Sequence, residues 1–308
     1  MSAPGAADTG APAAAEFRSG SAALVGRPNV GKSSLLNALL GEKLSIVTPR
    51  PQTTRHRILG VLSLPQAQIA FIDTPGLHAH AARALNKAMN RTATSALAEA
   101  DLAVLVLEAG RWTAEDQLVL ERIARAGHPA IAAVNKIDLV RPRERLLPYL
   151  AELGKRHAFL ELVPVSALKS DNVQDLRLTI AAHLPRAPAR FPIGELTDRD
   201  QRFRIAEMIR EKLTLELNQE VPYGIAVEVE RLAEEGERLT VDAAIWVARA
   251  GQKPIVIGAH GERLKRVGRA ARLALNDIFG GRLHLNLWVK VRANWADNAR
   301  ALKELGLE

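Results

Sequence analysis

A glycine-rich stretch near the start of the chain, residues 26–33, most constrains what this sequence can fold into. It reads Gly-Arg-Pro-Asn-Val-Gly-Lys-Ser, follows the apolar run 22–25 and opens into a helical pattern over 32–40. This spacing, G-x-x-x-x-G-K-[ST] between a strand and a helix, lets backbone N–H groups point at phosphate oxygens at a helix N-terminus. We predict a phosphate-binding loop made by Gly26, Arg27, Pro28, Asn29, Val30, Gly31, Lys32, Ser33 and Ser34.

The segment from residue 21 to about residue 184, which includes this loop, alternates between strand and helix patterns. Strands are expected at 22–25, 57–64, 68–72, 102–107, 130–134 and 160–165, and helices at 32–40, 84–98, 114–126, 144–156 and 173–183. Such alternation predicts an α/β domain with a doubly wound, mostly parallel sheet. Ligands bind such sheets at the carboxyl ends of the strands, where the motifs below all fall.

A second, smaller domain is expected after a proline-rich boundary. Three prolines fall between residues 185 and 192, which places the first domain at 21–185, a linker at 186–197 and the second domain at 198–308. The second domain has a helix pattern over 200–217, strands at 225–231 and 238–248, a helical pattern over 263–279 and a last alternating strand from 283. Residues 1–20 have the composition of a disordered tail.

Composition and charge narrow the classes of site and partner. The chain has no cysteine, which excludes disulfides, thiolate metal sites and cysteine nucleophiles. No apolar run approaches the ~20 residues that span a bilayer, so we expect a cytoplasmic protein. The formal net charge is +8, and the excess gathers between residues 249 and 303, where twelve basic residues face three acidic ones. This asymmetry predicts a polyanionic partner for the second domain.

Residues 135–138, Asn-Lys-Ile-Asp, indicate which base the first domain selects. The carboxylate of Asp138 can accept hydrogen bonds from guanine N1–H and its 2-amino group, whereas Asn135 is expected at the purine edge and Lys136 along the ring. Adenine lacks that pair of donors and would leave a buried carboxylate unpaired. Ser166-Ala167 ends the next strand, and the Ala167 N–H is expected to bond guanine O6.

Two further stretches predict loops that respond to the γ-phosphate. Asp73-Thr74-Pro75-Gly76 follows a strand, so that Asp73 can hold Mg²⁺ through water and the Gly76 N–H can bond the γ-phosphate. Gln52-Thr53-Thr54-Arg55 supplies a threonine, with Thr54 preferred over Thr53, that ligates Mg²⁺ only while the γ-phosphate holds the loop. The expected metal ligands are Ser33, Thr54 and Asp73, and the expected catalytic residues are Lys32, Thr54, Gly76 and Asn29.

The ordered set of motifs resembles the translation-factor class of small GTPases, with one departure. Leu77 stands where Ras-type enzymes place the glutamine that orients the attacking water, so we expect slow intrinsic hydrolysis. Asn29 resembles the asparagine that helps ligate a monovalent cation in potassium-stimulated relatives, and we hypothesise the same use of K⁺ here. His78 and His80 show no metal-ligand spacing and are interpreted as residues of a solvated loop.

The second domain contains a turn that resembles that of the KH domain. In KH domains a Gly-x-x-Gly turn between two helices lets the backbone of a single-stranded nucleic acid approach closely. Here an apolar segment leads into the turn and a basic helix follows it. The RNA-binding residues expected from this resemblance are Gly258, Ala259, His260, Gly261, Arg263, Lys265, Arg266 and Arg269. Trp246, Trp288 and Trp295 can stack on bases, but packing is the preferred interpretation.

Taken together, the motifs from about residue 21 to 301 resemble one family, the Era GTPases of bacteria. That resemblance implies a GTPase domain followed by a type II KH domain of αββααβ order, in a monomeric assembly factor for the 30S ribosomal subunit. It also implies GTP or GDP with Mg²⁺, contact with 16S rRNA near its 3′ end rather than with DNA, and peripheral association with the inner membrane. The alternative is a membrane-surface signalling GTPase whose basic segment meets anionic lipid. An RNA chaperone with a vestigial nucleotide site is disfavoured because the nucleotide motifs are intact.

Overall fold

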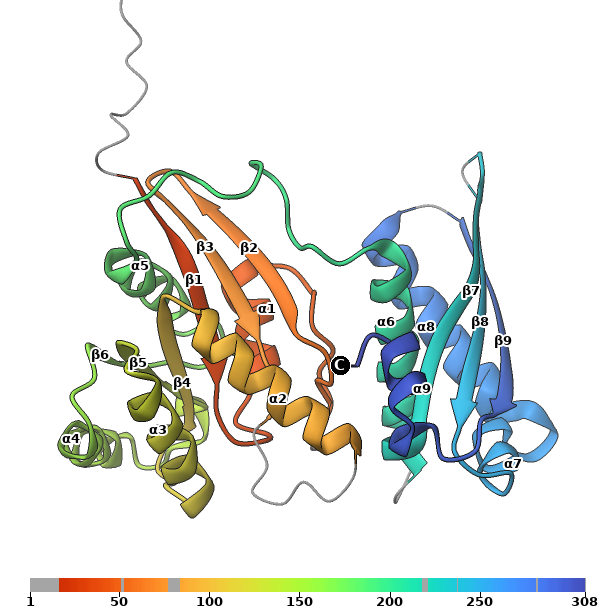
Figure 1. Ribbon diagram of the computed structural model, residues 1–308, viewed down its shortest axis with the longest axis horizontal. Coiled ribbons are helices and arrows are strands. Elements are labelled where there is room, and N and C mark those ends of the chain that lie inside the picture. Colours follow the sequence, from red (N-terminus) through yellow and green to blue (C-terminus); the bar gives the residue numbers. More distant parts are fainter. Residues whose placement is uncertain are drawn as a thin grey trace, which may run out of the picture.

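A computed structural model of the chain describes residues 17–50, 53–76, 84–217, 221–236, 238–280 and 282–307, and these form two α/β units side by side (Figure 1). Each unit has its own sheet. The expected tail up to residue 16, together with Gln52, Leu77, His78 and His80, lies outside the described residues.

The first unit is built on a six-stranded sheet. Its strands are β1 (Arg18–Val25), β2 (Ile58–Leu64), β3 (Ala67–Asp73), β4 (Leu102–Glu108), β5 (Ala130–Asn135) and β6 (Glu161–Pro164). Their order is β2-β3-β1-β4-β5-β6, and within this order β2 alone is antiparallel, so the predicted mostly parallel sheet is confirmed. Strand β1 begins earlier than expected, because Arg18, Ser19 and Gly20 pair with residues 67–69 of β3. The Ser19 N–H also donates to the Pro185 oxygen at 3.1 Å.

Helices cover both faces of this sheet. They are α1 (Lys32–Leu40), α2 (Ala84–Glu99), α3 (Ala114–Ala126), α4 (Leu146–Arg156) and α5 (Val173–His183). Helices α1 and α5 pack on one face, and α2, α3 and α4 pack on the other. The expected boundaries of α1, α3 and α5 are confirmed. Helix α4 begins two residues late, after a 3₁₀ turn over Arg143–Arg145, and Pro148 falls in its first turn, where proline is tolerated.

The second unit has the order αββααβ, as predicted. It comprises α6 (Gln201–Glu216), β7 (Ile225–Glu235), β8 (Arg238–Val247), α7 (Gln252–Ile257), α8 (Glu262–Phe279) and β9 (Arg282–Val291). Helices α6 and α8 cover one face of the β7-β8-β9 sheet. Strand β7 runs past its expected end because a register shift between Val229 and Arg231 interrupts the alternation without ending the pairing.

The chain then ends in two short elements that sequence patterns did not predict, η5 (Trp295–Asp297) and α9 (Ala299–Glu304). Helix α9 has six residues, too few to show a helical period. Trp295 is fully buried among apolar side chains, which confirms that this tryptophan packs rather than stacks on a base.

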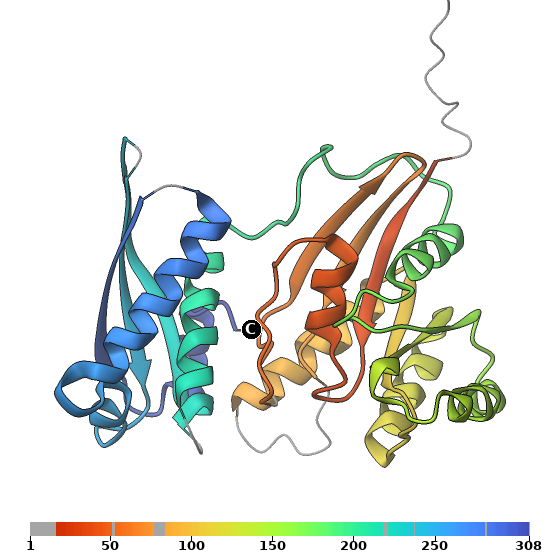
Figure 2. The same ribbon diagram turned by 180° about the vertical axis from the view of Figure 1, so that it is seen from behind.

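The predicted linker runs along the edge of the first sheet (Figure 2). The side chain of Gln68 on β3 donates to the Phe191 oxygen at 2.8 Å and accepts from the N–H groups of Arg190 and Phe191 at 2.8 and 2.9 Å. The Val61 N–H donates to the Leu196 oxygen at 2.8 Å. These bonds hold the linker against β2 and β3, so it is tied to the first unit along much of its length.

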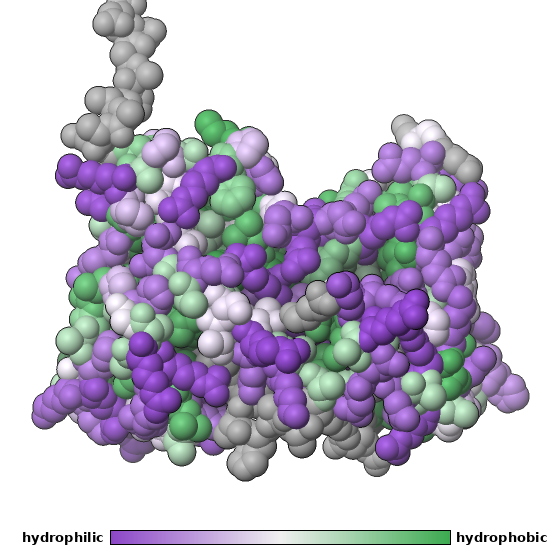
Figure 3. Space-filling view, viewed as in Figure 1, coloured by the Kyte–Doolittle hydropathy of each residue, from purple (hydrophilic) through white to green (hydrophobic). Residues whose placement is uncertain are grey.

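Hydrophilic residues dominate the face seen in Figure 3 over both units. Hydrophobic residues appear on this face mainly as small groups between them. Within the described residues, no helix is long and apolar enough to cross a membrane.

Candidate nucleotide site and nucleic-acid groove

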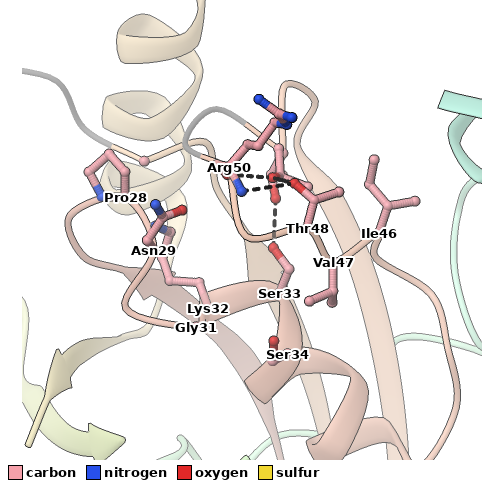
Figure 4. A pocket seen from close by; sticks show the side chains of 13 residues that line it. Pro28, Asn29, Gly31, Lys32, Ser33, Ser34, Ile46, Val47, Thr48 and Arg50 are labelled. Atoms are coloured by element: carbon pink, nitrogen blue, oxygen red, sulfur yellow. Dashed lines mark hydrogen bonds between the residues drawn. The ribbon is translucent and has the colours of Figure 1, made fainter. Parts of the chain in front are cut away.

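The predicted phosphate-binding loop joins β1 to α1, and its backbone leaves no room for larger residues at two positions (Figure 4). Gly31 has φ 98°, and a Cβ there would collide with Asn135 Nδ2. A Cβ at Gly26 would lie 2.5 Å from the Val106 oxygen on β4. Asn29 also adopts a positive φ, 62°, and its exposed side chain donates to the Pro49 oxygen at 3.4 Å. The two glycines therefore allow the loop to lie directly on the strand ends.

Lys32 lies inside this loop. Its Nζ donates to the backbone oxygens of Gly26 and Arg27 at 3.0 and 3.1 Å, and the residue is only 6% exposed. Burial lowers the pKa of Lys32 to about 8, although Asp73 opposes this effect. A phosphate group bound beside the amine would favour its charged form. The ammonium is thus held ready for an anion at the start of α1.

The three predicted metal ligands come together from separate parts of the chain. Ser33 Oγ lies 2.6 Å from Thr54 Oγ1, which is 3.4 Å from Asp73 Oδ2, and Ser45 Oγ donates to that same oxygen at 3.1 Å. Asp73 is fully buried, which raises its pKa, and its Oδ1 has no hydrogen-bond partner among the described residues. Two hydroxyls and an unpaired carboxylate oxygen are the hard donors that Mg²⁺ prefers, so this set fits the ion.

The two candidate threonines have different surroundings. Thr53 Oγ1 lies 2.6 Å from Thr48 Oγ1 and donates to the Arg50 oxygen at 2.8 Å, away from the cluster around Asp73. Figure 4 shows Thr48 and Arg50 on the segment that faces Ser33 across the pocket. The geometry therefore favours Thr54 as the metal ligand.

The Asp-Thr-Pro-Gly stretch ends against the phosphate-binding loop. A Cβ on Gly76 would lie 3.0 Å from Pro28 Cγ and 3.2 Å from the Pro28 nitrogen, so the Gly76 backbone approaches the loop closely. The buried Thr74 hydroxyl donates to the Leu24 oxygen at 2.9 Å and anchors the stretch to β1, with Pro75 between Thr74 and Gly76. The pocket between these segments is lined by Pro28, Asn29, Gly31, Lys32, Ser33, Ser34, Ile46, Val47, Thr48, Arg50, Thr53, Thr54 and Gly76.

Asn135 connects segments of the predicted base site, a role that sequence reasoning missed. Its Nδ2 donates to the Val30 oxygen at 2.9 Å, and its Oδ1 accepts from the Ala167 N–H at 3.0 Å. Ser166 Oγ donates to Asp138 Oδ1 at 2.6 Å. The side chain expected at the purine edge thus joins the phosphate loop to the Ser-Ala turn. The Ala167 N–H, expected at guanine O6, already has a partner.

A charge network beneath the loop was also missed. The Arg27 guanidinium contacts Glu108 Oε2 at 2.7 Å and Asp116 Oδ2 at 3.2 Å, and Lys136 Nζ lies 3.4 Å from the same Glu108 oxygen. Partial burial of Glu108 opposes ionisation, but the Arg27 and Lys136 cations hold the pKa of this carboxyl below its usual range. Asp116 belongs to the capping box that Thr113 opens at the start of α3. Arg27 thereby links the phosphate loop to the base motif.

The Gly-x-x-Gly turn lies between α7 and α8, as predicted, and borders a groove of about 500 Å³. Positive φ values of 76°, 50° and 78° at Gly258, His260 and Gly261 make the turn. Basic side chains of α8 and apolar side chains of β9 form the walls. The lining residues are Gly261, Leu264, Lys265, Gly268, Arg269, Arg272, Leu285 and Leu287. A basic wall and an apolar wall together can hold a phosphate backbone and its bases.

The predicted RNA-binding residues of α8 divide between two faces of the helix. Lys265 and Arg269 line the groove, whereas Arg263 donates to the Ile255 oxygen of α7, and Arg266 pairs with Glu216 of α6 at 3.2 Å. Residues three or four apart share a face, so Arg272 belongs with Lys265 and Arg269. That spacing was the available signal for Arg272, which sequence reasoning missed.

The segment that carries Thr54 also contacts α6 of the second unit. Glu211 receives Lys43 Nζ at 2.7 Å and the Val47 N–H at 3.0 Å. Arg210 donates to the Thr53 oxygen while forming a buried pair with Glu207 at 2.6 Å. Most of this contact is therefore polar and buried.

The same segment reaches further, and α2 makes a second contact between the units. Arg50 Nε donates to the Thr214 oxygen at 3.1 Å, and the Arg55 guanidinium donates to the Ile225 and Pro222 oxygens at 2.6 and 2.9 Å. On α2, Leu85 and Met89 pack in an apolar cluster that also contains Trp295, Leu302 and Leu307. The segment that carries Thr54 and helix α2 thus both contact the second unit.

A phosphate loop, a guanine-type base motif and a Gly-x-x-Gly groove define the class: a P-loop GTPase with a KH module. Comparisons with known proteins agree with this class. A family model described as a 50S ribosome-binding GTPase matches residues 21–136, and a KH domain model matches residues 220–296.

Whole-chain relatives define the family. GTPase Era of Marinobacter nauticus is 48% identical over 292 residues, which cover 95% of this chain and 96% of that protein. GTPase Era of Xanthomonas axonopodis pv. citri is 48% identical over 94% of this chain and 97% of that protein. The chain belongs to the GTPase Era family and is a GTPase.

Two solved structures share the complete fold. A Tyr-to-Ala variant of Era from Aquifex aeolicus, bound to GDP·AlF₄⁻, superposes with a TM-score of 0.92 at 38% identity and covers 94% of this chain and 99% of that one. Era in complex with MgGDPNP and nucleotides 1506–1542 of 16S ribosomal RNA gives a TM-score of 0.91 at 38% identity, with the same coverage.

Proposed function

We propose that this GTPase is a guanine-nucleotide switch that binds small-subunit rRNA near its 3′ end through the α8–β9 groove and acts in 30S subunit assembly. The complex of a 38% identical Era with a 16S rRNA fragment supports the partner. The observation that carries the switch is that residues 43–50 and 53–55, which include the predicted metal ligand Thr54, contact the KH module directly, as does α2. We also propose that the chain is a cytoplasmic monomer, with a GTPase domain at 21–185, a linker at 186–197 and a KH domain at 198–308.

The proposed nucleotide is GTP or GDP with Mg²⁺, and Ser33, Thr54 and Asp73 would hold the ion. When bound, Mg²⁺ neutralises charge that develops on the phosphate oxygens. Lys32 would pair with the β- and γ-phosphates, and the Gly76 N–H would bond the γ-phosphate. Asn29 lies exposed at the rim of the same pocket, where we propose that it helps hold K⁺. Equal turnover in potassium and sodium would contradict that last role.

Coupling between nucleotide and RNA requires contacts that differ in the two nucleotide states. Thr54 is one residue from Thr53, whose oxygen accepts from Arg210, and one from Arg55, which donates to the start of β7. Release of Thr54 after hydrolysis would therefore loosen contacts to α6 and β7 together. The KH module would be held differently with GDP than with GTP, and so would its groove.

The test is equilibrium binding of an RNA fragment from the 3′ end of small-subunit rRNA, at fixed salt, to the full chain with Mg·GDPNP and with Mg·GDP. Gly261→Asp adds a negative side chain at the groove, where a Cβ meets nothing within 4 Å. Gly236→Asp is the matched control, because that glycine also has a positive φ and open space but lies in the β7–β8 hairpin. We expect tighter binding with GDPNP, lost in Gly261→Asp and kept in Gly236→Asp.

An RNA affinity that is the same with either nucleotide and unchanged in Gly261→Asp would contradict the proposal. It would mean that the basic segment is an unspecific polyanion surface. Binding to vesicles of anionic lipid that survives Gly261→Asp would then favour the membrane-surface alternative. Nucleotide binding by both variants, measured in parallel, shows that the first domain is intact.

A further inference from the structure

A second polar pocket, of about 400 Å³, lies where the two units meet, away from the nucleotide site. Its walls come from the end of the Thr54 segment, from α2, from Arg199 just before α6, and from the C-terminal end of the described chain. Figure 1 places that end between the units. The lining residues are Arg55, His56, Arg57, Arg91, Thr92, Ser95, Arg199, Gly306 and Leu307. Neither the GTPase motifs nor the KH groove accounts for this pocket.

Among the residues that the structure describes, positive charge in this pocket exceeds the negative charge that faces it. Arg57 has a carboxylate partner in Glu99 at 3.5 Å, and Arg199 has one in Asp198 at 3.8 Å, and the carboxylates of both pairs are exposed. Arg55 donates to backbone oxygens, and Arg91 has no ion pair within the described residues. Among the described residues, these four guanidinium groups thus have two carboxylates as ion-pair partners, and both are exposed. The buried carboxylate of Glu207 lies nearby, 3.9 Å from His56 Nδ1, but it is paired with Arg210 at 2.6 Å.

The same side chains carry unpaired buried nitrogens. Nε of Arg55, Arg57 and Arg199, and Nδ1 of His56, have no hydrogen-bond partner in the described structure. Arg55 is only 3% exposed. Burial, reinforced by nearby Arg210, lowers the pKa of Arg55 to about 9, and burial lowers that of His56 to about 4. A buried cation with unmet donors is stabilised by an anion.

Hydroxyl groups complete the lining. Thr92 and Ser95 lie one turn apart on α2, beside Arg91. The Thr92 hydroxyl donates to the Ala88 oxygen at 3.0 Å, so Ser95 supplies the hydroxyl donor beside the guanidinium groups. Planar guanidinium groups with hydroxyl donors are the chemistry that recognises phosphate. We propose that this interdomain pocket binds a phosphate group other than those of the bound nucleotide.

A phosphate here would contact segments of both units. Arg55 and Arg57 follow Thr54, Arg91 belongs to α2, and Arg199 precedes α6. Its binding would favour the arrangement in which these segments lie together. The phosphate can come from a small anion or from the backbone of a bound RNA, and the two sources share this recognition chemistry. The site goes beyond the proposed function, since it requires neither RNA binding nor hydrolysis.

Calorimetric titration of inorganic pyrophosphate into the full chain tests the site, with saturating Mg·GDP to fill the nucleotide pocket and with ionic strength held constant. We expect saturable one-to-one binding that Arg91→Gln weakens about tenfold, the loss of one charged hydrogen bond. Arg125→Gln on α3, whose side chain is 81% exposed, removes the same charge far from the pocket and should leave binding unchanged. Ser95→Ala tests the hydroxyl wall without a change of charge and should weaken binding less.

The same variants tell the two sources apart. If the phosphate is a small anion, Arg91→Gln weakens pyrophosphate binding and leaves affinity for the rRNA fragment unchanged. If it belongs to RNA, Arg91→Gln but not Arg125→Gln weakens RNA binding, and pyrophosphate competes with the RNA. The proposal is overturned if the two variants behave alike in both titrations, since the charge would then act only as a diffuse surface field. Loss of RNA binding in Gly261→Asp bears on the groove alone.

Discussion

The nucleotide pocket and the KH groove differ in how far their charged side chains are buried. Lys32 is 6% exposed and Asp73 is fully buried, and both have defined partners within the protein. On α8, Lys265 and Arg269 lie exposed along the groove, and the Lys265 side chain is 72% exposed. A buried charge acts in a low dielectric, whereas an exposed one is screened by water and salt.

This difference in burial indicates how the binding energy is distributed over the residues of each site. In the nucleotide pocket, a few atoms held in place by packing supply most of the binding energy, so one substitution should abolish nucleotide binding. In the groove many weak contributions add, so single substitutions should have modest and similar effects. The contact between the units resembles the pocket, because Glu207 and Arg210 are buried there.

The largest effect is expected in the pocket. Lys32→Ala should weaken binding of Mg·GDPNP about a thousandfold, because a charge pair at about 4 Å is worth about 4 kcal/mol at an effective dielectric constant of 20. Lys155→Ala on the exposed surface of α4 is the control. Fluorescent-nucleotide titration measures both variants. A loss below tenfold in Lys32→Ala would show that the buried amine does not dominate the pocket.

The next largest effect concerns the contact between the units. Glu207→Gln leaves the Arg210 guanidinium buried without its carboxylate and should lower the free energy of unfolding by about 3–5 kcal/mol. Glu216→Gln on the same helix breaks only the exposed pair with Arg266 and should cost less than about 1 kcal/mol. Urea unfolding compares the two. An equal loss of unfolding free energy in the two variants would show that the buried pair stabilises the protein no more than the exposed pair does.

A pH effect should follow from His56, whose Nε2 lies 3.0 Å from the Leu305 oxygen. Burial lowers its pKa to about 4, so the unfolded chain binds more protons between its ordinary pKa of 6.5 and that value. Stability should therefore fall as pH drops through this window, by about 2 kcal/mol from pH 7.5 to 5.

The groups that face His56 are Glu207, Arg210 and Arg199, and Glu207 also titrates in acid. His56→Gln keeps a donor for Leu305 and removes the ring that titrates. Urea unfolding at the two pH values should show a smaller drop in this variant. The pKa of Glu207 is held below its ordinary value of 4.5, so Glu207 adds little between pH 7.5 and 5. The same drop in both proteins would show that His56 does not carry the pH dependence.

The smallest effect is expected in the groove. Arg272→Gln should weaken RNA binding by about 1 kcal/mol and reduce the slope of log K against log salt by about 0.7, the value for one contact with a single strand. Arg266 lies on the face of α8 that is directed toward Glu216, so Arg266→Gln should change the slope less than Arg272→Gln does. Filter binding at several salt concentrations measures both. A hundredfold loss in Arg272→Gln would mean that the groove depends on single contacts, as the pocket does.

Features that depend on neighbouring residues could be predicted from the sequence. The phosphate loop, the positions of α1, α3 and α5, and the strands and long helices of the second unit all follow from short-range patterns, whereas the short helix α7 was expected only from the KH resemblance. Glycine at position 31 reflects the positive φ that the loop requires, and the alternating residues of β9 reflect the two faces of a strand. Helix α9 was not predicted because it is too short to show a helical period. The end of β7 was placed too early because a register shift interrupts the alternation of its residues.

The sequence by itself determined which chemistry this chain carries, because motif residues meet their ligands through backbone geometry set within a few positions. Only the tertiary structure decided how those motifs are connected. Asn135 contacts Val30, which is 105 residues away in the sequence, and Ala167, which is 32 residues away. Arg27 contacts Glu108 over a separation of 81 residues, and Arg55 contacts Ile225 over a separation of 170. Such contacts depend on how strands order in a sheet and how the two units pack. No local pattern encodes that packing, because each partner's position results from many weak interactions along the whole chain.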